Sequence, residues 1–317
     1  MSIVVIGSVF VDLKGYPDDV FVPDGRNKGH IIQVHGGVSR NVAEDISRAG
    51  IPSLMVGLVD PGGIGSDVIS RLTASGVDTS HMRQIPNGCG TWLAVFDSRG
   101  DVAASISVRP DLTPIKDILL TEGEDIFSDA DSLVVELDME TETLDAAYSL
   151  AQKHHLPVYA VVSNISIALS QKERLRQTDC FVCNRQEAGM LFGSAMDLLE
   201  PEELCRILPI KLRQEDIPRM VVTLGEAGAV YACRNGESGM VPAENVHVAD
   251  TSGAGDAFFS GVVIGLTAGL SIREACEIGT ILASSVITVN DNTVTSGVRE
   301  LIQPYLDKKA DRNTDSI

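Results

Sequence analysis

Short apolar segments alternate along this chain with segments of helical period, and this alternation constrains the fold more than any other feature. The strand-like segments are residues 2–7, 53–59, 132–137, 157–162, 180–183 and 220–224. The helical patterns are residues 38–49, 66–74, 142–154, 186–191, 203–213, 253–270 and 272–289. Strands that alternate with helices are typical of a parallel sheet covered on both faces. We therefore expect an α/β protein with a mostly parallel central sheet and three layers.

Two stretches depart from this alternation. Residues 10–36 carry apolar residues that alternate with polar or charged ones between several glycines and prolines, which indicates exposed strands. Residues 91–95 and 102–108 flank the turn-forming residues 98–101 and are rich in β-forming side chains. We expect these two pieces to form one small sheet apart from the central one.

The charge of the chain excludes several classes of partner. It has 25 Lys and Arg against 44 Asp and Glu, a formal net charge of −19, and aromatic residues make up only 4%. Binding to nucleic acid or to an anionic membrane surface needs clustered basic residues, so we expect neither partner. We find no basic leader and no apolar run of about 18 residues. We therefore expect a cytoplasmic protein without a membrane span.

The six cysteines do not form a metal-binding pattern. Cys180 and Cys183 are close in sequence, but no second pair completes a zinc site. Because free cysteines favour protein interiors, we interpret all six as structural thiols in a reducing compartment.

The loop from Asp250 to Asp256 carries the strongest chemical signal. Its residues Gly253, Ala254 and Gly255 precede an apolar helix, and the first N–H groups of a helix have no partner within it. These donors and the helix dipole create a site for phosphate oxygens. Asp256 in the first turn could accept a proton from a substrate hydroxyl. The alternative for Asp256 alone is an acidic residue that merely complements the helix dipole.

Three further segments place polar groups beside strand ends or helix starts. Gly36 and Gly37 precede a helix that carries Asn41, whose amide could bind a polyol, although a turn with an N-cap explains them equally well. Asp12 follows the first strand, where open α/β sheets bind ligands. The segment 184–187 follows another strand and offers an amide and a carboxylate suited to hydrated Mg²⁺. Its alternative is an ordinary helix start.

Together these segments resemble the ribokinase-like, or PfkB, family of carbohydrate and nucleoside kinases. Residues 250–261 (DTSGAGDAFFSG) resemble its C-terminal signature, residues 36–50 (GGVSRNVAEDISRAG) its N-terminal glycine signature, and residues 184–187 its magnesium motif. The resemblance extends from residue 3 to about residue 300. The motif around Arg40 resembles pseudouridine kinases more than ribokinases.

The resemblance implies a ribokinase-like three-layer α/β/α fold and transfer of the ATP γ-phosphoryl group to a primary hydroxyl. Asp256 would be the general base, with Gly253, Ala254 and Gly255 as the anion hole. The residues implied to hold the acceptor are Asp12, Gly36, Gly37, Asn41 and, as a lesser candidate, Asp138. The residues implied at the nucleotide are Asn184, Thr223, Gly225, Gly228, Thr251, Ser252 and Asn290. Glu187 would hold Mg²⁺ through water, and Asp250 a possible activating K⁺.

The resemblance also implies the domain organisation. Residues 1–9, 37–86 and 111–305 would form the kinase core, residues 10–36 and 87–110 a β lid, and residues 306–317 a flexible tail. Relatives often dimerise through the lid sheet, so we expect a homodimer.

Three alternatives stay open. The acceptor could be a free sugar, as in ribokinases and fructokinases, rather than a pseudouridine-like nucleoside. It could be a phosphosugar, for which the available basic residues are Lys14, Arg26, Lys28, Arg40 and Arg109. The protein could also be a non-catalytic nucleotide-binding relative, although the motifs at residues 250–256 and 184–187 are intact.

Overall fold

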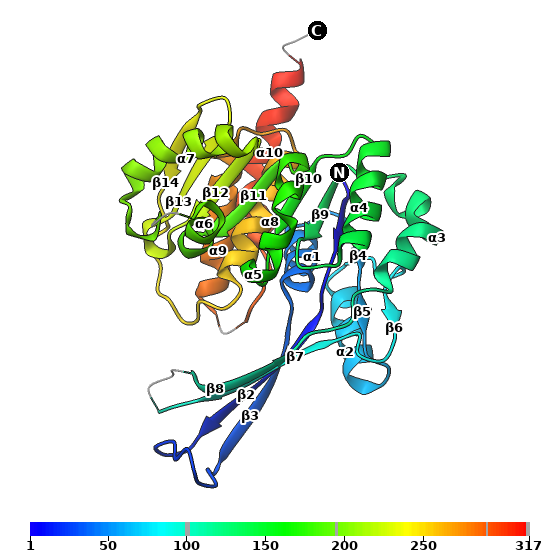
Figure 1. Ribbon diagram of the computed structural model, residues 1–317, viewed down its shortest axis with the longest axis vertical. Helices are drawn as coiled ribbons and strands as arrows, with labels where there is room; N and C mark the ends of the chain where they lie inside the picture. Colours follow the sequence, from blue (N-terminus) through cyan, green and yellow to red (C-terminus); the bar gives the residue numbers. More distant parts are fainter. Residues whose placement is uncertain (99–101, 194–195, 290, 315–317) are drawn as a thin grey trace.

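A long, mostly parallel sheet forms the centre of the computed structural model, which describes residues 1–98, 102–193, 196–289 and 291–314 (Figure 1). Within these residues the strand order is β14-β13-β12-β11-β10-β9-β1-β4. The strands are β1 (Ile3–Ile6), β4 (Ser53–Val56), β9 (Ser132–Glu136), β10 (Val158–Val161), β11 (Cys180–Asn184), β12 (Arg219–Thr223), β13 (Ala229–Cys233) and β14 (Ser238–Val241). All neighbours pair in parallel except β12–β13 and β13–β14, which are antiparallel.

Helices cover both faces of this sheet and bury two separate apolar cores. Successive side chains of a strand point to opposite faces, and accordingly Ile3 and Val5 lie in one core while Val4 and Ile6 lie in the other. The first core includes side chains from α1 (Val38–Arg48), α2 (Gly63–Ala74), α8 (Ala254–Thr267), α9 (Ile272–Ile287) and α10 (Val298–Thr314). The second includes side chains from α3 (Ile115–Phe127), α4 (Thr141–Lys153), α6 (Arg185–Phe192) and α7 (Pro201–Glu215). The expected three-layer α/β fold is confirmed.

A second sheet projects from one end of the core (Figure 1). Its order is β3-β2-β7-β8, with strands β2 (Phe10–Pro17), β3 (Gly29–Gly36), β7 (Gly90–Phe96) and β8 (Val102–Val108). The two chain segments that form it are joined by the parallel pairing of β2 with β7. The predicted separate sheet is therefore present, and we refer to these four strands as the lid sheet.

Several elements differ from the sequence-based expectation. Residues 53–59 form two strands, because after β4 the chain leaves the central sheet and β5 (Leu58–Val59) pairs with β6 (Arg83–Gln84). We missed α3, whose apolar residues do have helical spacing, and the antiparallel strands β13 and β14. We expected a frayed tail from residue 306, but α10 continues to Thr314. A helix can extend beyond its last core residue because its backbone bonds form within the helix.

The positions of the cysteines agree with a structural role. All six are free thiols, and each is buried except Cys205, which is half-buried. In the described part of the chain, no helix is both long and apolar enough to cross a membrane.

Candidate active site between the core and the lid sheet

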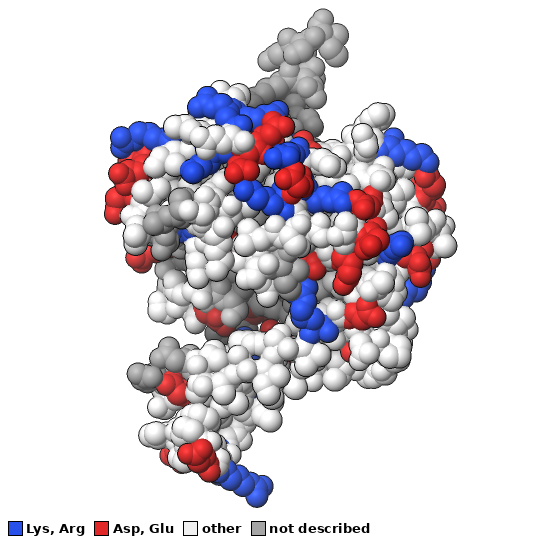
Figure 2. Space-filling model, in the orientation of Figure 1, with Lys and Arg blue, Asp and Glu red and all other residues white. Residues whose placement is uncertain are grey.

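A cavity of about 590 Å³ lies between the lid sheet and the carboxyl ends of the central strands. Figure 2 shows the hollow between these two parts of the molecule. The lid sheet and the residue after it contribute Phe10, Asp12, Lys14, Gly36, Trp92, Ser107 and Arg109. The core contributes Gly37, Val38, Asn41, Ser163, Asn164, Ser252, Gly253, Asp256 and Asn292. Asp12, Gly36, Gly37, Asn41, Ser252, Gly253 and Asp256, all expected at the site from sequence, therefore surround one space.

Asp256 lies in the first turn of α8, and its carboxylate contacts Asn41 across the cavity floor. The Asn41 Nδ2 donates to Asp256 Oδ2 at 2.7 Å. Burial and the negative charge of Glu136 raise the pKa of Asp256 to about 6, while the Asn41 hydrogen bond and the charge of Arg40 oppose this shift. At neutral pH the carboxylate is therefore mostly ionised and can still accept a proton.

The loop before α8 packs closely against the backbone of the segment after α9. Gly253 has φ of 77°, and a Cβ atom there would lie 2.1 Å from the Asn292 carbonyl oxygen. A Cβ atom on Gly255 would meet nothing within 4 Å, so open space faces this turn. We expected three free N–H groups, but that of Ala254 donates to the Thr251 carbonyl at 3.3 Å. Thr251 itself does not line the cavity.

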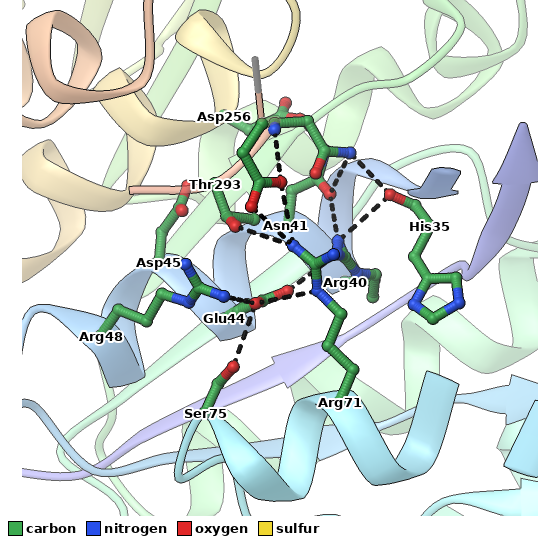
Figure 3. Close-up of polar contacts among 12 residues, drawn as sticks. His35, Arg40, Asn41, Glu44, Asp45, Arg48, Arg71, Ser75, Asp256 and Thr293 are labelled. Atoms are coloured by element: carbon green, nitrogen blue, oxygen red, sulfur yellow. Dashed lines mark hydrogen bonds and ion pairs between the residues drawn. The ribbon is translucent and has the colours of Figure 1, made fainter. Parts of the chain in front are cut away.

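Two donors fix the orientation of the Asn41 amide. The Arg40 Nη1 donates to Asn41 Oδ1 at 3.0 Å, and the Asn292 Nδ2 donates to the same oxygen at 3.3 Å (Figure 3). Because the amide oxygen faces these donors, the amide nitrogen faces Asp256. Both Arg40 and Asn292 also donate to the His35 carbonyl, at 3.2 and 2.6 Å.

A buried ionic network lies beneath this contact (Figure 3). The fully buried Glu44 carboxylate is paired with Arg40 at 2.7 Å, Arg48 at 2.6 Å and Arg71 at 3.2 Å. Arg71 also contacts Asp291 at 2.9 Å. The network joins α1, α2 and the segment after α9. Arg40 is thus engaged inside the protein and does not line the cavity, so it is no candidate ligand for a phosphosugar.

The buried Asp45 belongs to the same region. Its Oδ1 accepts from the Val294 N–H at 2.8 Å, while Oδ2 has no partner within the described residues. Burial raises the pKa of Asp45 well above its usual value. The segment after α9 is thereby attached to α1 through the hydrogen bond from the Val294 N–H to Asp45, and also through Arg71 of α2, which contacts both Asp291 and Glu44.

Glu136 at the end of β9 accepts several hydrogen bonds. We did not identify this residue from the sequence. Its buried carboxylate accepts from the Ser8 N–H at 2.9 Å, the Ser39 hydroxyl at 2.8 Å and the Ser163 hydroxyl at 2.9 Å. These bonds join the ends of β1, β9 and β10 to the first turn of α1. An acidic residue in an otherwise apolar strand was the available signal, because an unpaired buried charge is costly.

Asp138 does not line the cavity, but it positions residues that do. Its carboxylate accepts from the Ser163 hydroxyl at 2.8 Å and the Asn164 N–H at 2.6 Å, and lies 3.5 Å from Arg109 Nη1. Burial and the nearby Glu136 raise the pKa of Asp138 to about 6. Because this carboxylate already has several partners, it acts through its neighbours.

Four of the residues expected at the nucleotide lie at or just after the ends of the next two strands of the sheet, β11 and β12. Asn184 ends β11 and is paired in register with Thr223 at the end of β12, and Gly225 and Gly228 flank the short turn that follows β12. Asn290 lies outside the described residues. Asn184, Thr223, Gly225 and Gly228 do not line the 590 Å³ cavity, whereas Ser252, which was also expected at the nucleotide, does.

Asn184 and Glu187 form a capping box at the start of α6. The Asn184 Oδ1 accepts from the Glu187 N–H at 2.9 Å, and Glu187 Oε2 accepts from the Asn184 N–H at 2.8 Å. Within the described residues no group of three His, Cys, Asp or Glu could hold a metal ion. Mg²⁺ commonly keeps most of its waters and contacts few protein oxygens, so the two side chains fit a hydrated ion. Their confirmed local role is capping.

Asp250 lies beside a second cavity of about 610 Å³, which also contains Lys14, Ser252 and Asp291. Its Oδ1 accepts from the Ser252 N–H at 2.8 Å. Burial acts to raise the pKa of Asp250, but hydrogen bonds from Ser252 and the charge of Lys14 outweigh it and lower the pKa. Asp250 is therefore an anion that could attract a monovalent cation.

The fold matches that of a known class of protein. A ribokinase of Arabidopsis thaliana, solved with ribose and ATP, has a TM-score of 0.79 to this structure at 18% identity, over 96% of this chain and 98% of that one. The family model described as pfkB family carbohydrate kinase matches residues 1–295. The chain belongs to the pfkB family of carbohydrate kinases. It is a phosphotransferase, an ATP-dependent kinase of nucleosides or sugars.

Two curated relatives match over nearly their whole length. The guanosine-inosine kinase of Exiguobacterium acetylicum is 32% identical over 304 residues, covering 95% of this chain and 99% of that protein. The pseudouridine kinase of Escherichia coli K12 is 24% identical over 306 residues, covering 95% and 96%. Of these two, the pseudouridine kinase that Arg40 suggested is the more distant. Arg40 is a poor marker of the acceptor because it is buried in the ionic network.

The network generates a prediction about stability. Glu44→Gln removes the carboxylate that compensates Arg40, and removing one partner of a buried ion pair costs about 3–5 kcal/mol. We expect urea denaturation to show a loss of this size. The matched control is Glu173→Gln. Glu173 pairs with Arg176 at the surface, and its side chain is 75% exposed. We expect this variant to lose less than about 1 kcal/mol of unfolding free energy. Equal losses in both variants would contradict a structural role for Glu44.

Proposed function

We propose that the protein phosphorylates the primary hydroxyl of a nucleoside, with guanosine and inosine as the first acceptors to test. The observation that carries the proposal is the Asp256 carboxylate, which lies in a cavity that also contains Asn41, Gly253 and Trp92. The identity to guanosine-inosine kinase supports the choice of acceptor. Pseudouridine is the second candidate, because another relative of this chain is named a pseudouridine kinase.

In the proposed reaction the acceptor hydroxyl loses its proton to Asp256. The hydroxyl oxygen bonds to the γ-phosphorus of ATP, the bond from this phosphorus to the bridging oxygen breaks, and ADP leaves with the electron pair. The N–H groups of Gly253 and Gly255 stabilise the negative charge on the transferred group, because they are at the positive end of α8. In phosphoryl transfer, positioning and electrostatics account for nearly all of the catalysis.

The remaining site residues receive roles by their position. Asp12, Gly36, Gly37 and Asn41 would hold the sugar of the acceptor. Gly37 has φ of 99°, and a Cβ atom there would lie 2.8 Å from the Phe10 nitrogen, so only glycine permits this contact between α1 and the lid sheet. Asp138 would act by positioning Ser163 and Arg109.

The nucleotide would lie along the ends of β11 and β12. Its contacts would come from Asn184, Thr223, Gly225, Gly228 and the loop residues Thr251 and Ser252. Asn184 and Glu187 would hold hydrated Mg²⁺, which neutralises phosphate charge when bound. Asp250 would bind a monovalent cation such as K⁺.

The structure weighs against a phosphosugar as the acceptor. Of the five basic residues considered for this role, only Lys14 and Arg109 line the cavity, and Arg109 faces Asp138. Lys28 instead pairs with Asp18 at 3.2 Å in the lid loop. A non-catalytic role is disfavoured because the contact between Asn41 and Asp256 is in place.

A coupled ADP-release assay tests this function. We expect turnover of guanosine and inosine with ATP and Mg²⁺, and lower turnover of ribose, because ribose leaves Trp92 and Arg109 without a ligand. The panel should include pseudouridine, uridine, adenosine and fructose. Turnover of free sugars in the absence of any nucleoside activity would overturn the proposal.

Replacement of the proposed base provides a second prediction. Asp256→Asn keeps the shape and the hydrogen bond from Asn41 but accepts no proton, so kcat should fall about 10²- to 10⁴-fold. Asp216→Asn is the control, because Asp216 precedes β12 at the opposite end of the sheet and should leave kcat unchanged. A near-normal kcat for Asp256→Asn would refute the base assignment.

The pH profile of the unmodified enzyme checks the same assignment. The base must be ionised, and its raised pKa places the loss of kcat near pH 6 rather than near pH 4. Activity should therefore be present above pH 6 and fall as the pH decreases through this value. Asp138 titrates in the same range, so the profile is repeated with Asp256→Asn, in which the steep decrease in kcat should disappear.

We infer that the lid sheet closes over the acceptor and pairs with a second copy of the chain. Its outer face exposes Leu93, Ile106 and Val108, which is unusual for a solvated sheet. On the face shown in Figure 2 the lid carries few charged side chains. Sedimentation velocity should detect a dimer, and Ile106→Lys should convert it to a monomer. A monomeric parent protein at high concentration would overturn this inference.

A further inference from the structure

The register of the lid sheet arranges its cavity-facing residues in a row. Asp12 on β2 is paired with Trp92 on β7, and Trp92 is paired with Ser107 on β8. Paired residues on neighbouring strands point to the same face of a sheet, and all three line the cavity. Arg109 follows Ser107 by two residues and lines the cavity as well. A carboxylate, an indole and a guanidinium thus follow one another across the wall of the cavity that the lid sheet forms.

Asp138 holds Arg109 in a defined position. The Arg109 Nη2 donates to the Asp138 carbonyl at 3.2 Å, and Nη1 lies 3.5 Å from the Asp138 carboxylate. Asp138 is fixed in turn by the N–H and hydroxyl of Ser163. A guanidinium has five N–H donors in a rigid plane, so donors remain to reach into the cavity. The side chain is 39% exposed, which leaves it accessible to a ligand.

The surroundings favour a neutral ligand with two acceptors over an anion. Asp138 compensates the charge of Arg109, so a phosphate at this point would meet little net positive charge. The neighbouring Trp92 offers a surface on which a planar base can stack. With the ribose hydroxyls at Asp12, a base stacked on Trp92 would direct one edge toward Arg109.

The chemistry of the bases then selects the ligand class. A 6-oxopurine presents two adjacent acceptors, O6 and N7, which a guanidinium can contact with two hydrogen bonds. Adenine has an amino group at N6, so a hydrogen-bond donor of the base would face the donors of the guanidinium. We propose that Arg109 determines acceptor specificity by binding O6 and N7 of a 6-oxopurine nucleoside, and that Asp138 positions it. This assignment rests on the proposed nucleoside kinase function.

A double-mutant cycle between enzyme and substrate tests the assignment. The values of kcat/KM are measured for guanosine, 7-deazaguanosine and adenosine with the parent enzyme and with Arg109→Met. The parent should prefer guanosine over adenosine by roughly 10- to 100-fold, the range for a bidentate arginine contact. Removal of N7 should cost the parent about 10-fold and the variant less than about 2-fold, because the lost partner is already absent.

Two controls separate this contact from general damage. Arg26→Met removes an exposed arginine from the loop between β2 and β3, outside the cavity, and should keep the full preference for guanosine. Quenching of the single tryptophan, Trp92, reports nucleoside binding without turnover. The guanosine affinity of Arg109→Met should fall toward that for adenosine. If Arg109→Met does not fold, Arg109→Lys, which keeps the charge but not the planar pair of donors, should show the same loss of preference.

The outcomes distinguish this assignment from the proposed function. If the parent phosphorylates guanosine, 7-deazaguanosine and adenosine equally well, the role of Arg109 is refuted while the nucleoside kinase function stands. The role is also refuted if Arg109→Met retains the preference for guanosine. If the parent binds and phosphorylates free sugars only, the proposed function and this assignment are both overturned.

Discussion

The buried pairing of Arg40 with Glu44 is the interaction on which the rest of the site depends. Glu44 has no exposed surface, yet it contacts three arginines, and these reach α2 and the segment after α9. The same Arg40 guanidinium fixes the amide of Asn41, whose nitrogen then contacts Asp256. The carboxylate that we propose as the general base, Asp256 on α8, is therefore oriented by an ion pair within α1. An arginine buried to this extent would be costly alone, so the geometry at the floor of the cavity depends on its partner.

A second buried carboxylate organises the other wall. Glu136 accepts hydrogen bonds from Ser8, Ser39 and Ser163. Burial is the main reason that the pKa values of Asp256 and Asp138 are raised, and the negative charge of Glu136 adds to both shifts. Positive charge from Arg40 acts in the opposite direction on Asp256. The proposed base thus lies between a buried cation and a buried anion. Burial and these two charges together leave a carboxylate that is ionised at neutral pH yet basic enough to accept a proton.

Much of the fold and part of the candidate site could be predicted from the sequence. Alternating strands and helices gave the parallel sheet, and the glycine loops indicated Gly37, Gly253 and Asp256, because these signals are local. The contacts of Arg40 could not be predicted, since a basic residue next to a glycine motif is as consistent with a ligand contact as with a buried pair. Asp138 was placed among the acceptor contacts, although several protein donors occupy its carboxylate. These distinctions depend on which side chains the fold brings together over long sequence separations.

The attachment of β3 limits how the lid sheet can move. Its last residues, His35 and Gly36, are buried, and the His35 carbonyl accepts from two buried donors, whereas Gly29 to Gln33 are exposed. Rotation about the root of this strand would break both bonds. Bending along the exposed length of the strand would break neither. The lid sheet is therefore held at the end nearest Asp256. Bending at its exposed end would leave the residues nearest Asp256 in place.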